Sequence, residues 1–141
     1  MVDVPDALRA LMWSVHDAEA ALARRLHVGV TDVQALQVLT GRDVGTVELG
    51  AALGIRSASA TALADRLQAA GHLRRAAHPT DGRRVVLELT PSARTEVLTA
   101  LRPLLDAIGG VVADLDDAEQ VVVHRFLRRA TAAVTDFAAD G

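Results

Sequence analysis

Apolar residues recur at helical spacing over the first half of the chain. Between residues 6 and 27 they return every three or four positions, which is typical of one face of an amphipathic helix. The same period recurs over 32–40, over a short stretch that begins at Thr46, and over 57–70. We expect Thr31 and Thr46 to cap their helices. Each helix is followed by a glycine that we expect to end it: Gly29, Gly41, Gly54 and Gly71.

The period changes after residue 72. The stretches Leu73–Ala77 and Arg84–Leu89 flank residues 78–82, whose sequence His-Pro-Thr-Asp-Gly is a dense turn signal. Polar and apolar residues alternate in the second stretch, and this alternation is typical of a strand. We therefore predict a β-hairpin with Val85, Leu87 and Leu89 on one side of its second strand and Val86 and Glu88 on the other.

Two long helices complete the pattern. Thr90 followed by Pro91 is a strong helix start, and Pro103 and Gly109-Gly110 predict a kink in the helix that follows. Asp116 and Glu119 have the spacing of a capping box, which explains the local acidic residues better than paired hydrolytic carboxylates do. A last helix is expected over 117–138. The predicted fold class is mainly α with a small β-hairpin.

Composition excludes several classes of protein. Half of the 141 residues are apolar, but only Trp13, Phe126 and Phe137 are aromatic, so leucine, valine and alanine must build the core. There is no cysteine, hence no disulfide framework, catalytic thiol or thiol redox switch. The five histidines lack ligand spacing, and no nucleophile–base pair or phosphate-binding loop is present. We expect a cytoplasmic protein with no membrane segment, cofactor, metal or enzymatic activity.

Charge is unevenly distributed along the chain. The net charge is −3, and all 15 cationic side chains are arginines. Residues 56–84 carry six arginines against Asp65 and Asp81, a local charge of +4, whereas the remainder carries −7. A basic segment on an acidic protein is the electrostatic signature of a nucleic-acid interface.

The basic segment coincides with two short helices and the hairpin, the element order of a winged helix-turn-helix. The second short helix begins with small residues, and its hydroxyls at Ser57, Ser59 and Thr61 can contact base edges or phosphates in the major groove. The hairpin tip carries Arg83 and Arg84, which suit a narrow minor groove.

Four motifs resemble one known family. They are Glu48-Leu49-Gly50-Ala51-Ala52-Leu53-Gly54, Thr61 with Asp65-Arg66-Leu67, Ala70-Gly71-His72-Leu73-Arg74-Arg75, and Pro79-Thr80-Asp81-Gly82-Arg83-Arg84 leading to Leu89-Thr90. They are similar to the DNA-binding core of the multiple-antibiotic-resistance regulator (MarR) family of bacterial transcription factors. The Asp-x-Arg sequence of the wing is the most specific part of the resemblance.

The resemblance implies a symmetric homodimer, usually a repressor, that binds a pseudo-palindromic operator in double-stranded DNA. It places Ser57, Ser59 and Thr61 in the major groove and Arg83 in the minor groove, with Asp81 bracing Arg83. Arg56 departs from the family pattern. A serine often stands at this position, so either Ser57 caps the helix in its place or Arg56 contacts a phosphate.

Several residues keep two interpretations. Arg66 is a structural ion-pair partner or a phosphate contact, Arg74 and Arg75 are solvated or contact phosphates, and turn chemistry alone partly explains Asp81. Trp13 and His16 share one helix face. In the resembling family this helix borders a cleft for small aromatic acids, but a dimer-interface tryptophan is the simpler interpretation.

These observations predict three regions: an N-terminal dimerisation helix (1–30), a winged helix-turn-helix domain (31–90) and C-terminal dimerisation helices (91–141). The leading functional hypothesis is a DNA-binding transcriptional repressor that a small aromatic effector, bound at Trp13 and His16, releases from DNA. The alternative is a dimeric winged-helix module that binds a protein partner and not DNA. Salt-sensitive binding to duplex DNA distinguishes the two.

Overall fold

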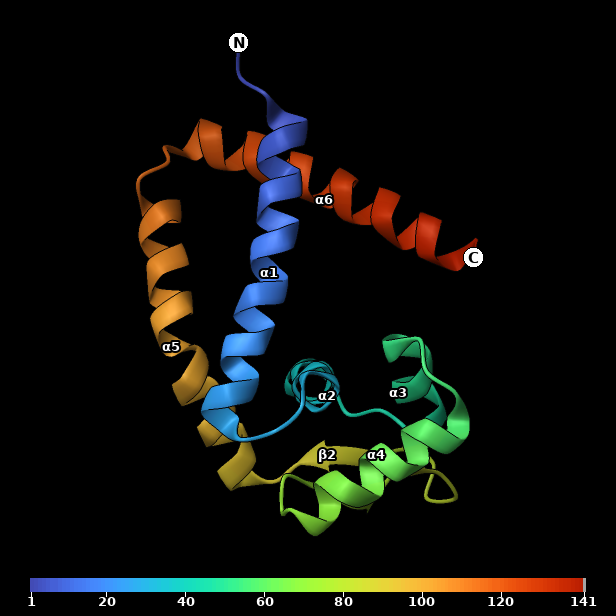
Figure 1. The fold of residues 1–141 in the computed structure, drawn as a ribbon. Coiled ribbons are helices and arrows are strands. Elements are labelled where there is room, and N and C mark those ends of the chain that lie inside the picture. The colour runs from blue at the N-terminus through green and yellow to red at the C-terminus, as the bar shows by residue number, and fades with distance from the viewer. Residues whose placement is uncertain (141) are drawn as a thin grey trace. The chain divides into compact units, whose positions relative to one another are not determined.

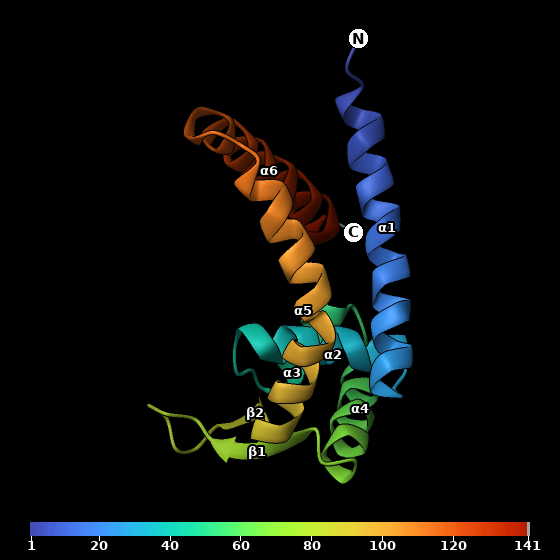
Figure 2. The same ribbon diagram turned by 90° about the vertical axis from the view of Figure 1, so that its left-hand side faces the viewer.

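A computed structural model describes residues 1–140 and divides the chain into two compact units, Met1–Leu101 and the part from Arg102 onward. Figures 1 and 2 show the elements in two views. In chain order they are α1 (Val4–Leu26), α2 (Val30–Gly41), α3 (Thr46–Leu53), α4 (Ser57–Ala69), β1 (Leu73–Ala77), β2 (Val85–Leu89), α5 (Pro91–Ala113) and α6 (Asp117–Ala139). This order confirms the predicted fold class of a mainly helical chain with one β-hairpin.

The predicted helix boundaries are wrong at three points. Helix α1 ends before Gly29, because His27 adopts the left-handed conformation (φ 55°, ψ 41°) and forms its C-cap. Gly29, and not Thr31, is the N-cap of α2, and Gly45, and not Thr46, is the N-cap of α3. Both glycines have extended backbone, and their carbonyl groups accept the first helical hydrogen bonds.

Strands β1 and β2 form an antiparallel hairpin in which Leu73 pairs with Leu89 and Ala77 with Val85. Leu87 and Leu89 are buried as predicted, but Val85 is exposed and Val86, expected on the opposite side, is buried as well. Val85 lies next to the connecting loop, which projects away from helices α2 to α4, so the core does not cover its side chain (Figure 2).

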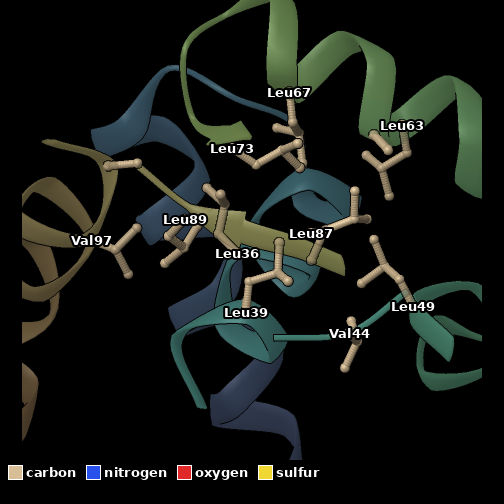
Figure 3. Packing of buried hydrophobic residues seen from close by; sticks show 13 residues of the cluster. Leu36, Leu39, Val44, Leu49, Leu63, Leu67, Leu73, Leu87, Leu89 and Val97 are labelled. Atoms are coloured by element: carbon tan, nitrogen blue, oxygen red, sulfur yellow. The ribbon is translucent and has the colours of Figure 1, made fainter. Parts of the chain in front are cut away.

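The core of the first unit lies between the helix-turn-helix and the hairpin. Leucines from α2, α3 and α4 converge on leucines of both strands (Figure 3). A bridge between Val44 and Leu87 adds one further pair to the sheet. The recurrence of leucine and valine at these positions agrees with the low aromatic content. The largest fully buried side chains of this cluster are Leu36, Leu39, Leu49, Leu67, Leu73, Leu87, Val44 and Val97. Val33 is also fully buried, in a second cluster with Leu22 and Ala23.

Thr90 lies between β2 and α5, and its hydrogen bonds link the turn after α4 to the start of α5. Its hydroxyl accepts from the Ala93 N–H (3.2 Å), as predicted for an N-cap, and donates to the Gly71 carbonyl (2.8 Å). The Thr90 N–H also donates to the His72 carbonyl at 3.1 Å. One residue therefore binds both the first turn of α5 and the turn that ends α4.

The second unit contains the remainder of α5 and all of α6. Helix α5 continues through Pro103 and Gly109-Gly110, so these residues do not end it. The predicted capping box at the start of α6 is present: Asp116 accepts from the Glu119 N–H (2.8 Å), and Glu119 accepts from the Asp116 N–H (2.9 Å). No residue of α6 is buried within the described chain.

Gly50 sets how closely α3 approaches α4. A Cβ atom at this position would lie 3.1 Å from Cβ of Ala60 and 3.2 Å from the Ile55 carbonyl oxygen. We therefore expect Gly50→Ala to lower the free energy of unfolding by about 1–3 kcal/mol, as overpacking does. Urea denaturation measures this change. Gly41→Ala is the matched control, because a Cβ there meets nothing within 4 Å, and an equal loss in both variants would contradict the assignment.

Candidate nucleic-acid interface

Helices α3 and α4 form the helix-turn-helix. Gly54 ends α3 in the left-handed conformation (φ 65°), and its N–H and that of Ile55 donate to carbonyls of the last turn of α3. Arg56 occupies the N-cap of α4 without a side-chain capping bond, and Ser57 is the first helical residue. Ser57 therefore does not replace Arg56 as N-cap, and a phosphate contact by Arg56 stays a prediction.

The outer face of α4 is exposed and lined by short side chains. The hydroxyls of Ser57 and Ser59 make no hydrogen bond within residues 1–140, whereas Thr61 Oγ1 donates to the Ser57 carbonyl at 3.0 Å. The buried face carries Ala60, Leu63, Ala64 and Leu67, as the periodicity predicted. Since no long side chain stands on the first turn of α4, its backbone can approach a ligand closely.

Four arginines of the basic segment are held by carboxylates. Arg74 pairs across the hairpin with Glu88 (2.6 Å), and Arg75 reaches back to Asp65 (2.7 Å) and Gln68 on α4. Arg66 pairs with Asp32 at 2.5 Å, and Arg84 pairs with Glu48 at 2.8 Å.

Three of these carboxylates lie outside residues 56–84. Five carboxylates therefore accompany the six arginines in the folded chain: Asp32, Glu48, Asp65, Asp81 and Glu88. These eleven side chains, here called the stripe, have a net charge of +1, whereas residues 56–84 counted along the sequence have a net charge of +4. The segment count therefore overstated the positive charge. Arg56 and Arg83 are the two arginines of the stripe whose side chains make no ion pair or hydrogen bond among the residues that the structure describes.

Arg83 lies in the exposed loop between the strands. Its backbone N–H donates to Oδ1 of Asp81 at 3.2 Å, while its guanidinium group has no partner in the described chain. Asp81 thus braces the backbone of Arg83 and not its side chain. Arg84, the other residue expected to contact DNA from this loop, fastens the loop to the first turn of α3 through Glu48.

Two contributions to this surface were missed by sequence reasoning. Asp32 is 7% exposed, receives Arg66 on Oδ1 and accepts from the Gly29 N–H on Oδ2 at 3.2 Å. Glu48 was recognised only as an acid in the first turn of α3, but it also binds Arg84. Both pairs join residues more than 30 positions apart, so no local spacing could have revealed them. For Arg66 the ion-pair interpretation is the one present in the structure.

Trp13 and His16 lie side by side on α1, with ring centroids 6.0 Å apart. Trp13 is 68% exposed, and His16 Nδ1 is 2.9 Å from the Met12 carbonyl oxygen. Since a carbonyl only accepts, Nδ1 carries the proton in this contact, and Nε2 is the nitrogen left for another partner.

Metal sites and membrane spans are the two other features to consider in residues 1–140. Within residues 1–140 no group of three or more histidine, aspartate and glutamate side chains could hold a metal ion. Over the same residues, no helix combines the length and apolarity that a membrane span needs.

The helix-turn-helix, the hairpin and the arginine in its loop define a winged helix-turn-helix protein. The model of the MarR family matches residues 28–84. The HTH-type transcriptional regulator YcgE of Bacillus subtilis is 30% identical over 111 residues, which cover 78% of this chain and 72% of that protein. The chain therefore belongs to the MarR family of transcriptional regulators, which confirms the resemblance of its motifs.

Solved structures share the fold. A MarR family protein from Bacillus stearothermophilus has a TM-score of 0.73 at 20% identity, with 94% of this chain and 93% of that chain covered. A mutant of MepR from a multidrug-resistant clinical isolate of S. aureus has a TM-score of 0.73 at 14% identity, with coverages of 94% and 98%. At these identities the likeness concerns the fold alone.

Proposed function

We propose that this chain is a sequence-specific regulator that binds double-stranded DNA as a homodimer, acts as a repressor at a pseudo-palindromic operator, and works in the cytoplasm. In a two-fold dimer the two α4 helices would enter successive major grooves about 34 Å apart, and each wing would reach a minor groove. The chain's family membership supports transcriptional regulation, whereas repression, the palindrome and the dimer are parts of the proposal.

The observation that carries the proposal is that the side chains of Arg56 and Arg83 make no ion pair or hydrogen bond within residues 1–140. Four neighbouring arginines pair with carboxylates, whereas among the described residues the Arg56 side chain at the start of α4 and the Arg83 side chain in the wing loop have no such partner. Phosphate and minor-groove contacts need cations without an internal partner. The N-terminus of α4, with its unpaired backbone N–H groups, adds a further site that favours phosphate.

The proposal is tested by selecting bound sequences from a random duplex library with the purified protein, and by titrating the recovered duplex at several salt concentrations. We expect one symmetric motif and an affinity that falls linearly with salt on logarithmic axes. Failure to enrich any duplex, or affinity that does not respond to salt, would favour the alternative of a protein-binding winged-helix module.

The proposed effector site at Trp13 and His16 leads to a further prediction. A small anionic aromatic ligand would stack on the exposed indole and bind Nε2 of His16, which donates only when the ring is protonated. We expect the ligand to change Trp13 fluorescence and to release DNA over one concentration range, and Trp13→Phe to weaken the release about tenfold.

Trp13 is the only tryptophan, so its emission reports on this site alone. Such a ligand must bind the DNA-competent and DNA-incompetent conformations with different affinity, or it shifts nothing. DNA binding that no member of a broad panel of aromatic acids alters would indicate a constitutive regulator controlled by its own abundance.

A further inference from the structure

The loop that carries Arg83 is organised around one imidazole nitrogen. His78 Nδ1 lies 3.2 Å from the backbone nitrogen of Thr80 and 3.1 Å from that of Asp81, and the Thr80 hydroxyl is 3.3 Å away. Backbone N–H groups only donate, so Nδ1 must accept, and the ring is neutral with its proton on Nε2. His78 therefore holds the turn only in its uncharged form.

One further bond connects this nitrogen to Arg83 through Asp81, and two more bonds, both to Arg84, hold the same loop. Asp81, whose N–H is held by His78, receives the Arg83 N–H on its carboxylate, and the Asp81 carbonyl receives the Arg84 N–H at 3.0 Å. The His78 N–H closes the loop by donating to the Arg84 carbonyl at 2.9 Å. The position of Arg83 thus depends on a short chain of bonds that begins at the His78 ring.

We propose that His78 is a positioning residue for Arg83 and that protonation of its ring disrupts the loop conformation in which the wing binds DNA. This inference rests on the proposed DNA-binding function. A protonated Nδ1 would point an N–H at two other N–H groups, so the turn must open. Histidine side chains as a class change charge between about pH 5 and 8, so binding is compared at pH 7.5 and pH 5.5.

The charged groups around His78 would have opposite effects on a protonated ring. Asp81 in the same loop would attract a cationic ring, whereas Arg83 and Arg84 would repel it, and Glu48 of α3 is already occupied by Arg84. A cationic ring drawn to the Asp81 carboxylate would compete with the bond from the Arg83 N–H. Protonation thus removes the acceptor for two N–H groups and also weakens the brace on Arg83.

The test compares wild type, His78→Ala and His78→Asn on the selected duplex by fluorescence anisotropy at pH 7.5 and 5.5 and constant ionic strength. The asparagine side-chain oxygen can accept from N–H groups two and three positions on, but it does not titrate. At pH 7.5 we expect His78→Ala to bind about fivefold more weakly than wild type and His78→Asn to bind equally well.

At pH 5.5 wild type should bind about fivefold more weakly than His78→Asn. The ratio of these two proteins cancels the contributions of the other four histidines. If His78→Ala binds as well as wild type at pH 7.5, or if wild type gains on His78→Asn at pH 5.5, His78 is not a positioning residue; the second result would make it a phosphate contact.

NMR of the free protein separates this inference from DNA binding. We expect His78 Nδ1 to show the ¹⁵N shift of an unprotonated acceptor at pH 7.5, and the Thr80 and Asp81 amide signals to move with protonation of the ring. In His78→Asn these amides should not respond to pH. If the Thr80 and Asp81 amide signals do not move when the His78 ring is protonated, the proposal is overturned. If they move as expected but the protein binds no duplex, only the proposed function is overturned.

Discussion

Arg83→Ala should weaken binding to every duplex, specific or not, by about 1–3 kcal/mol for each half-site. A homodimer loses the contact twice, and the slope of log affinity against log salt should become shallower by about one for each wing. The reason is that the Arg83 guanidinium group has no partner within residues 1–140 and stands in the exposed loop. Anisotropy titrations on one selected and one random duplex measure both quantities.

Arg74→Ala is the matched control, because Arg74 lies on the same hairpin but pairs with Glu88. We expect it to change affinity much less than Arg83→Ala. Ser59→Ala should affect base preference at one position more than overall affinity, since Ser59 lies on the exposed face of α4. If Arg83→Ala binds as well as wild type, the wing does not contact DNA.

Phe126→Asp should convert the protein from a dimer into a monomer. Large apolar side chains are exposed along α1, α5 and α6 in the single chain, far more than an isolated soluble chain normally leaves uncovered. A second copy that covers them would bury Phe126 twice, so a charge there should raise the dimer dissociation constant at least about 100-fold. The exposed residues include Leu11, Met12, Val15, Leu105, Ile108, Val112, Val122, Phe126, Val134 and Phe137.

Sedimentation equilibrium measures the change against the chain mass of 14.8 kDa. Arg128→Asp adds the same acidic side chain two positions further along α6, which faces a different direction, and it should leave the dimer intact. A folded wild-type monomer at micromolar concentration would refute the dimer. A monomer has only one α4 helix, so it can contact only one half of a symmetric operator. Phe126→Asp should therefore also lose most of its affinity for that operator.

The parts of the fold that repeat a local pattern could be predicted from the sequence. The helical period over 57–70 predicted that one face of this helix is buried, and Leu63 and Leu67 lie on that face of α4; Asp116 with Glu119 identified the start of α6. The caps at Gly29 and Gly45 could not be predicted in this way. Serine and threonine are the usual N-caps, and a glycine cap depends on extended backbone that only the surrounding structure fixes.

The candidate interface could be predicted by its residues but not by their partners. The Asp-x-Arg motif pointed to Arg83 and Asp81, yet the same reasoning expected Arg84 to contact DNA and left Arg66 as either an ion-pair partner or a phosphate contact. Their carboxylates come from α3 and α2, and long-range pairing of this kind has no signature in a single sequence. His78 was recognised only as part of a turn signal, because the atoms that its ring nitrogen contacts are determined by the three-dimensional fold of the loop.

The hydroxyl of Thr90 has a mechanical consequence. It binds the Gly71 carbonyl and the Ala93 N–H at once, so the last turn beyond α4 and the first turn of α5 share one pivot. A rotation of α5 about that pivot would therefore carry the end of α4 with it. The serine-rich beginning of α4 is the end far from Thr90, so the part of α4 that we propose to face DNA would move through the widest arc.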